Sequence, residues 1–438
     1  MPDSLSPLAL STALLVLSYA AIMSERVNRA IVALVGGALM IFTGVIDQEQ
    51  AIEGEDFNTL ALLIGMMLFV SIARRSGMFQ YLAIWSAKVA RGSPGLILVL
   101  LSLVTAVVSA FLDNVTTVLL IAPVTLIITA ELKVPPYPFL FTEILASNIG
   151  GTATLIGDPP NILIGSAADL TFNDFAVNLT PVILVVLAAQ LLLNHVIWGR
   201  DLRADAAARD RIMAFNARQS ITDWRLLRQS LVVLALVIAA FVLARPLHLE
   251  AGTIALSGAA LLLLLDNWPR PGEAQTHHLN QFFGEVEWIT IFFFVGLFVI
   301  VAGVEHAGLL SLLADALARA TGGDLATTAL AILWASALLS AAIDNIPFVA
   351  TMIPVIKAMA PAFGGPDGLL PLWWSLSLGA CLGGNGTLIG ASANLIVAGI
   401  AERVGVPFRF MTFLKLAFPM MMISIAISTG YVYLRYLM

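Results

Sequence analysis

Two aspartate-asparagine pairs interrupt long apolar stretches of the chain, Asp113-Asn114 in the first half and Asp344-Asn345 in the second. If these stretches lie in a membrane, an ionised carboxylate there is costly unless a cation or a proton compensates it. The two aspartates are therefore candidates for binding a cation or carrying protons. The alternative is that each aspartate caps the helix that follows it, by accepting hydrogen bonds from free backbone N–H groups.

A glycine-rich polar stretch follows the first pair, from Ser147 to Asn161, and a second copy runs from Cys381 to Leu395. The first copy reads Ser-Asn-Ile-Gly-Gly-Thr-Ala-Thr-Leu-Ile-Gly-Asp-Pro-Pro-Asn, which cannot continue a regular helix. Unwound backbone in a membrane is tolerated only where protein buries it or where it lines a polar cavity. The two copies therefore predict two broken helices at a substrate or ion site, with a purely structural role as the alternative.

Two further acidic residues, Glu143 and Asp158, have no acidic counterpart in the second half, where Leu376 and Ala391 stand. A task that is needed only once, such as proton coupling, would explain this asymmetry. The alternatives are a hydrogen bond from Glu143 to a neighbouring helix, and a helix start at Asp158-Pro-Pro.

We expect all of these polar groups to converge midway through a bilayer. The expected proton or cation coupling residues are Asp113, Asp344, Asp158 and Glu143. The residues expected to face both aspartate-asparagine pairs are Asn148, Thr152, Thr154, Asn161, Asn385, Thr387 and Asn394.

The composition is that of a polytopic membrane protein. The 438 residues are 59% hydrophobic and 11% charged, whereas soluble domains carry about 25% charged residues. The single cysteine excludes a cysteine-clustered metal site, and we expect no cofactor. The formal net charge of -6 gives no reason to expect a nucleic-acid partner. The sequence holds no phosphate-binding loop for ATP, so any transport must be driven by a gradient or by another subunit.

The apolar segments predict an all-α fold with two similar halves, residues 1–199 and 230–438, joined by an arginine-rich cytoplasmic linker over 200–229. In the first half we expect helices over 8–23, 30–46 and 58–73, an amphipathic piece over 77–91, a hairpin over 96–130, a broken helix over 138–168 and a span over 177–198. In the second half we expect helices over 230–244, 251–266 and 287–303, an amphipathic piece over 308–320, a hairpin over 325–360, a broken helix over 371–400 and a span over 412–436.

Each hairpin is expected to be re-entrant, with its aspartate-asparagine pair at the tip, although two full spans are the alternative. Five spans plus one re-entrant hairpin per half make an odd number of crossings, which predicts inverted repeats. With a periplasmic N-terminus, all of the 22 basic residues except Arg245, Arg319, Lys357 and Arg435 fall on the cytoplasmic side. This distribution agrees with the positive-inside rule and predicts a multi-pass protein of the bacterial inner membrane.

At Phe111-Leu-Asp-Asn-Val-Thr-Thr-Val and at Asn148 to Asn161 the sequence resembles the ion transporter superfamily, in the branch with ArsB-type arsenite permeases and the melanosomal P protein. The resemblance covers nearly the whole chain and implies a homodimer working as an elevator. A scaffold from 8–73, 177–199, 230–303 and 412–436 would stay fixed, and a transport domain from 94–168 and 325–400 would move. The binding positions implied by the resemblance are Asp113, Asn114, Thr116, Asn148, Gly151, Thr152, Asp344, Asn345, Gly384 and Asn385.

Neither motif contains a basic residue, which favours a neutral or cationic substrate. The first hypothesis is an arsenite and antimonite efflux permease that exchanges its substrate for protons, because arsenite near neutral pH is mainly an uncharged trihydroxide. The second is a sodium-proton antiporter, and an organic-anion or silicic acid transporter on the same scaffold is a further alternative. From another class, the chain could be a channel or the membrane subunit of a pump with a soluble ATPase partner.

Overall fold

The structure is a computed structural model that describes residues 6–24, 26–199, 201–268 and 270–438, and all regular elements within those ranges are helical. In this part of the chain, eight helices are long and apolar enough to cross a membrane. Four shorter apolar helices, α1, α2, α15 and α20, accompany them. The chain therefore has the all-helical, multi-pass architecture that its composition predicted.

The helices of the first half follow the predicted order closely. They are α1 (Pro7–Met23), α2 (Arg29–Phe42), α3 (Gln48–Glu53), α4 (Phe57–Ala73), α5 (Met78–Val89), α6 (Pro94–Phe111), α7 (Asn114–Leu132), α8 (Tyr137–Thr152), α9 (Pro159–Ala168), α10 (Phe172–Asn178) and α11 (Thr180–Trp198). The segment between the halves contains α12 (Ala206–Ala214).

The second half repeats most of this order. Its helices are α13 (Trp224–Val242), α14 (Ala244–Leu247), α15 (Ala251–Asn267), α16 (Gly272–Gly284), α17 (Trp288–His306), α18 (Leu309–Ala320), α19 (Leu325–Ala342), α20 (Asn345–Ala358), α21 (Leu370–Gly383), α22 (Ser392–Arg403) and α23 (Phe410–Val432). The helix pairs α6–α7 and α19–α20 and both helix breaks lie where the sequence placed them, and both helices of the first pair are long enough to cross a membrane.

The expected linker is shorter than its polar composition indicated. Helix α13 begins at Trp224, because the side chain of Asp223 accepts hydrogen bonds from the backbone N–H groups of Arg225 and Leu226. This cap extends the helix through a polar first turn, before the apolar segment that begins at residue 230. The short polar helices α3, α10, α12 and α16 were also not predicted, since they lie outside the apolar pattern.

Glycines let the helices of the two halves cross closely. A Cβ on Gly65 of α4 would lie 2.6 Å from backbone of α15, and one on Gly296 of α17 would lie 2.3 Å from backbone of α2. The hairpins pack against the broken helices in the same way. A Cβ on Gly150 would lie 2.1 Å from the carbonyl oxygen of Ala106, and a Cβ on Gly383 would lie 2.6 Å from that of Ala337. Glycines at matching positions of the two halves thus allow similar close crossings.

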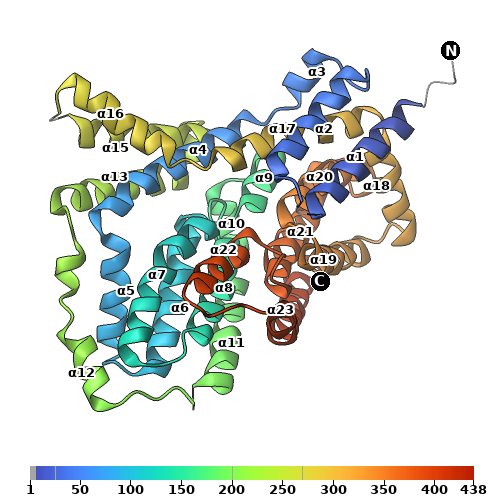
Figure 1. Ribbon diagram of the computed structural model, residues 1–438. Helices are drawn as coiled ribbons and strands as arrows, with labels where there is room; N and C mark the ends of the chain where they lie inside the picture. The colour runs from blue at the N-terminus through green and yellow to red at the C-terminus, as the bar shows by residue number, and fades with distance from the viewer. Residues whose placement is uncertain (1–5, 25, 200, 269) are drawn as a thin grey trace.

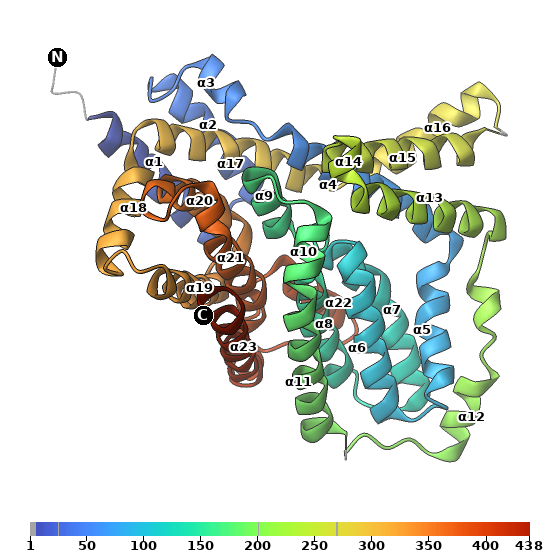
Figure 2. The same cartoon turned by 180° about the vertical axis from the view of Figure 1, so that it is seen from behind.

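Figures 1 and 2 show how the elements are grouped. Helices α5, α6, α7, α8 and α11 stand together as one bundle, and α19, α21 and α23 form a second group beside it. Helices α2, α4, α15 and α17 run along one side of both groups. The starts of α7, α9, α20 and α22 meet between these parts, and their residues line the cavity described next.

Candidate functional site

Both aspartate-asparagine pairs lie beside the two helix breaks, around a cavity of about 70 Å³. Asp113, Asn114, Asp158 and Asn345 line this cavity directly. Asp344 lies next to it, because its carboxylate is bonded to Arg29 and Ser392, which line the cavity. The residues that the sequence singled out from two distant segments are thus brought together at one place.

The cavity is surrounded by the N-terminal ends of helices. Six helices contribute their N-cap or first residue to the lining, among them Arg29 of α2, Asp113 of α7, Asp158 of α9, Glu287 of α17, Asn345 of α20 and Ala391 of α22. Each helix N-terminus carries the equivalent of roughly half a positive charge. These partial charges explain how several carboxylates can lie close together at one half-buried cavity.

The two hairpin tips hold their aspartates differently. Asp113 accepts hydrogen bonds from the backbone N–H of Thr116, at 2.8 Å, and from the hydroxyl of the same residue. At the equivalent position the second tip has Pro347, which offers neither a backbone N–H nor a hydroxyl. Asp344 instead accepts from the backbone N–H of Ile346, at 3.1 Å, and forms an ion pair with Arg29 at 2.7 Å.

The carboxylate of Asp158 is only partly satisfied by hydrogen bonds. Its side chain is 1% exposed, and one carboxylate oxygen accepts from Asn114 at 3.3 Å. The other oxygen has no hydrogen-bond partner within the described residues. Helix α9 does begin here, but Pro159 and Pro160 supply no N–H groups, and the carboxylate of Asp158 caps nothing. The two prolines therefore leave this carboxylate free for a ligand.

Buried asparagines hold the two breaks in shape. Asn161 donates to the carbonyl oxygens of Thr152 and Thr154, at 3.1 and 2.9 Å. Its counterpart Asn394 donates to the carbonyl oxygens of Gly384 and Thr387, at 2.8 and 2.9 Å. Each asparagine thus supplies the donors that the interrupted helix lacks.

The remaining asparagines connect the two breaks with each other. Asn148 donates to the side-chain oxygens of Asn385 and Asn394, at 2.9 and 3.0 Å. Asn385 donates to the carbonyl oxygen of Leu145 at 3.3 Å. The amide groups of Asn148 and Asn385 are therefore occupied by protein in this conformation.

Several other predicted binding residues support the backbone and do not line the cavity. Gly151 and Gly384 allow other backbone segments to approach closely. A Cβ on Gly151 would lie 2.5 Å from the carbonyl oxygen of Gly157, and a Cβ on Gly384 would lie 3.1 Å from that of Gly390. The hydroxyls of the predicted threonines are bonded to protein: Thr116 donates to Asp113, Thr152 to the Asn148 carbonyl, Thr154 to the Ala110 carbonyl and Thr387 to the Ala341 carbonyl.

Glu143 lies apart from the cavity lining. It is buried on α8, where one carboxylate oxygen accepts from the hydroxyl of Thr125 on α7. The other oxygen has no partner within the described residues. This is the contact to a neighbouring helix that the sequence left open as the alternative to coupling.

The sequence did not identify Arg29, Glu287, Thr290 and Ser392 as site residues, although they line the cavity. Neither motif contains a basic residue, as the sequence shows, but Arg29 reaches the cavity from the start of α2. The two charged residues share one signal, because each stands at the start of an apolar helix, as Asp113 and Asp158 do. A search for charged residues at helix starts would have found them.

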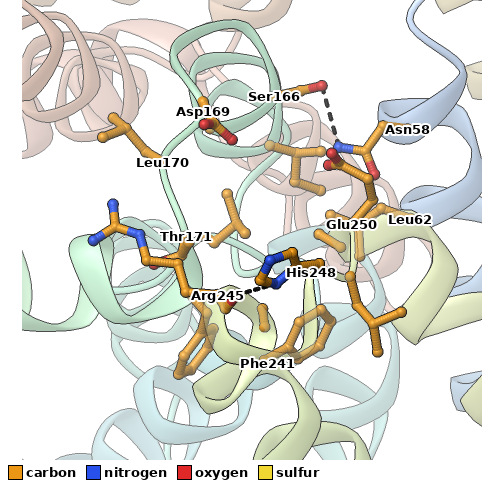
Figure 3. Close-up of a pocket in the computed structure, with 17 residues that line it drawn as sticks. Asn58, Leu62, Ser166, Asp169, Leu170, Thr171, Phe241, Arg245, His248 and Glu250 are labelled. Atoms are coloured by element: carbon orange, nitrogen blue, oxygen red, sulfur yellow. Dashed lines mark hydrogen bonds between the residues drawn. The ribbon is translucent and has the colours of Figure 1, made fainter.

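A larger cavity of about 460 Å³ lies elsewhere, between the end of α9 and the start of α15. Its polar lining includes Asp169, Arg245, His248 and Glu250 (Figure 3). Figure 3 also shows Asn58 donating to the hydroxyl of Ser166 at 3.2 Å. This cavity contains neither hairpin tip. We therefore take the smaller cavity as the candidate site.

Comparison with known proteins adds information on the family. A family model described as citrate transporter (CitMHS) matches residues 19–379. An uncharacterized transporter of Mycobacterium tuberculosis, Rv2684, is 43% identical over 426 residues, which cover 96% of this chain and 97% of that protein. The human P protein is 35% identical over 505 residues, covering 96% of this chain and 59% of the human protein. The resemblance to the P protein is thus confirmed, while the resemblance to arsenite permeases stays a prediction.

One solved structure supports the overall architecture. The crystal structure of the YdaH transporter from Alcanivorax borkumensis aligns with a TM-score of 0.63 over 98% of both chains. The two sequences are 16% identical, so this similarity concerns the fold alone.

Proposed function

The chain belongs to the citrate transporter family, and from this membership we propose that it is a secondary active transporter driven by cation exchange. Transport itself follows from the family. The coupling to a cation is our proposal, and it depends on the carboxylates at the cavity.

The observation that carries the proposal is the pair of uncompensated aspartates. Asp113 and Asp158 line one cavity, and neither forms an ion pair within the described part of the chain. Asp158 also has a buried oxygen without a partner. A proton or a Na⁺ ion at this place would satisfy that oxygen and compensate the charge.

Sodium-proton exchange is the reaction that this geometry supports best. The same carboxylates can bind Na⁺ or H⁺ in turn, which is the chemistry that antiport requires. Most of the amides that could bind an uncharged solute are bonded to protein, as described for Asn148, Asn161, Asn385 and Asn394. The carboxylates of the cavity are therefore better placed to bind a cargo than its amides.

Arsenite and antimonite efflux in exchange for protons is the second candidate. The cavity of about 70 Å³ is small, which suits a small uncharged trihydroxide. Asn345 lines the cavity, and its side-chain amide offers both a hydrogen-bond donor and an acceptor there. This amide is the group that could bind such a solute.

The proposed architecture is that of two inverted repeats in a homodimer, with the hairpins and broken helices moving as an elevator. The repeated close crossings at Gly65 and Gly296, and at Gly150 and Gly383, support the repeat. Helix α20 has 14 residues, fewer than the roughly 20 of a full span, which supports a re-entrant hairpin in the second half. We also propose a periplasmic N-terminus, a cytoplasmic linker and a location in the bacterial inner membrane.

The test is an ion flux measurement on purified protein in liposomes. An imposed pH gradient should drive Na⁺ accumulation, and an imposed Na⁺ gradient should move protons, read with an internal pH-sensitive dye. Parallel vesicles with arsenite, silicic acid or citrate identify the cargo. Proton movement with arsenite alone would favour the second candidate. Fluxes that do not saturate and show no exchange would indicate a channel, and no flux at all would indicate a subunit that needs an ATPase partner.

A further inference from the structure

The ion pair between Arg29 and Asp344 lies at the wall of two cavities. Arg29 and Ser392 line the 70 Å³ cavity and also a second cavity of about 460 Å³. Asp344 lines the second cavity from the other side of the pair. A cation that binds in either cavity would therefore lie close to this ion pair.

The guanidinium of Arg29 is bonded to the carboxylate oxygen of Asp344 that would otherwise be available to bind a cation. Its Nη1 atom lies 2.7 Å from Oδ2, the carboxylate oxygen that accepts no backbone N–H. At the first hairpin tip the same oxygen of Asp113 is bonded to the hydroxyl of Thr116, a group that Pro347 cannot replace. The second tip therefore has an oxygen available for a cation, and in this conformation the cation is an arginine.

Several contacts fix Arg29 in this position. It donates to the hydroxyls of Ser392 at 2.9 Å and Thr290 at 3.4 Å, and its guanidinium lies 5.1 Å from the ring centre of Phe293. Asp113, Asp158 and Glu287 are the other charged groups that line the same cavity. Arg29 is the only basic group among the residues that line it, so it is the internal cation with which a transported cation would compete.

We propose that Arg29 is a tethered competitor of the transported cation. It holds Asp344 in this conformation, and a cation binds to Asp344 only after the guanidinium has left. Arg29 thereby sets the cation affinity of the site and favours release of the ion. This role rests on the proposed cation exchange, and it goes beyond the assignment of Asp344 as a coupling residue.

The experiment is equilibrium binding of ²²Na⁺ to the purified full-length protein at fixed pH. Arg29→Gln should tighten Na⁺ binding by about tenfold, because the competitor is gone. A loss of structure would weaken binding, so a gain in affinity is a result that a merely structural role does not give. Arg26→Gln, at an exposed arginine three residues earlier, is the matched control and should bind as the wild type does.

The Asp344→Asn background tests whether the effect acts through this carboxylate. There, Arg29→Gln should change Na⁺ affinity by less than about threefold. If Arg29→Gln does not fold, Thr290→Val removes one contact to the guanidinium without touching Asp344 and should tighten Na⁺ binding by a smaller factor.

Two outcomes would overturn the role of Arg29 while leaving cation exchange intact. One is unchanged or weaker Na⁺ binding in Arg29→Gln when the wild type exchanges Na⁺ for protons. The other is an equal gain in the Asp344→Asn background. If neither the wild type nor any variant binds Na⁺ or exchanges it, the proposed function and this role fail together.

Discussion

Asn148 on α8 donates its side-chain amide to Asn394 on α22, 246 residues later in the chain, over 3.0 Å. Asn394 in turn donates to two carbonyl oxygens of its own break, Gly384 and Thr387. The shape of the second break therefore depends on a residue of the first half. Both side chains are fully buried, which makes this connection between the halves expensive to lose.

Replacing the asparagines that hold the breaks should destabilise the protein more than it changes ion specificity. Asn161→Ala removes donors to the Thr152 and Thr154 carbonyls, and we expect a loss of about 2–4 kcal/mol in the free energy of unfolding. Thermal unfolding in detergent measures this. Asn280→Ala, at an exposed position of α16, is the control and should leave the unfolding midpoint unchanged. Equal midpoints for both variants would contradict the structural role of Asn161.

Neutralising Asp158 should abolish cation exchange while the protein still folds. Asp158→Asn keeps the acceptor for Asn114 but removes the charge, and we expect the exchange rate in liposomes to fall by at least about a hundredfold. Asp113→Asn should behave similarly. Asp169→Asn, at an exposed position just after α9, should retain exchange. The coupling role would be refuted by normal exchange in both cavity variants.

Adding one methyl group at the hairpin crossings should prevent assembly of the site. In Gly150→Ala the new Cβ would lie 2.1 Å from the carbonyl oxygen of Ala106, and backbone cannot yield as a flexible side chain can. We expect little folded protein in size-exclusion chromatography. Gly430→Ala, whose Cβ would meet nothing within 4 Å on α23, should fold normally and gain up to about 1 kcal/mol from helix propensity. Normal yields of Gly150→Ala would show that the crossing can widen.

The loop before α4 should make stability depend on pH. Burial, with a smaller contribution from Asp56, raises the pKa of Glu55 from 4.5 to about 7. Between about pH 4.5 and pH 7, Glu55 therefore keeps its proton in the folded protein but releases it in the unfolded chain. The resulting stabilisation is complete below about pH 4.5 and is lost as the pH rises through 7.

The Glu55→Gln variant isolates this contribution. Its unfolding midpoint should fall less than that of the wild type between pH 5 and pH 8, whereas Glu53→Gln, at the exposed last residue of α3, should follow the wild type. Identical pH dependence in wild type and Glu55→Gln would exclude the effect.

The sequence predicted the helices well because apolar segments are interrupted by residues with strong local preferences. Helices α7 and α20 begin at Asn114 and Asn345, directly after the aspartates that were expected at the tips. The helix break between Thr152 and Pro159 was also predictable, because glycine and proline in this segment disfavour a continuous helix. The polar helix α16 was not predicted, because its sequence has no apolar pattern.

The site itself was only partly predictable. Asp113 and Asp158 could be found because they stand inside apolar sequence. Arg29 could not be assigned to Asp344, because 315 residues separate them and no local pattern reports which helix starts pack together. The occupied amides of Asn148 and Asn385 were unpredictable for the same reason, since their partners are set by the folded arrangement.

Asp113 serves its own helix as well as the cavity, because it accepts from the first turn of α7 through Thr116. An ion or proton that draws this carboxylate away also loosens that turn. In that case, binding at the site and loss of the hydrogen bond between Thr116 and Asp113 occur together, and the first turn of α7 re-forms when the ion leaves.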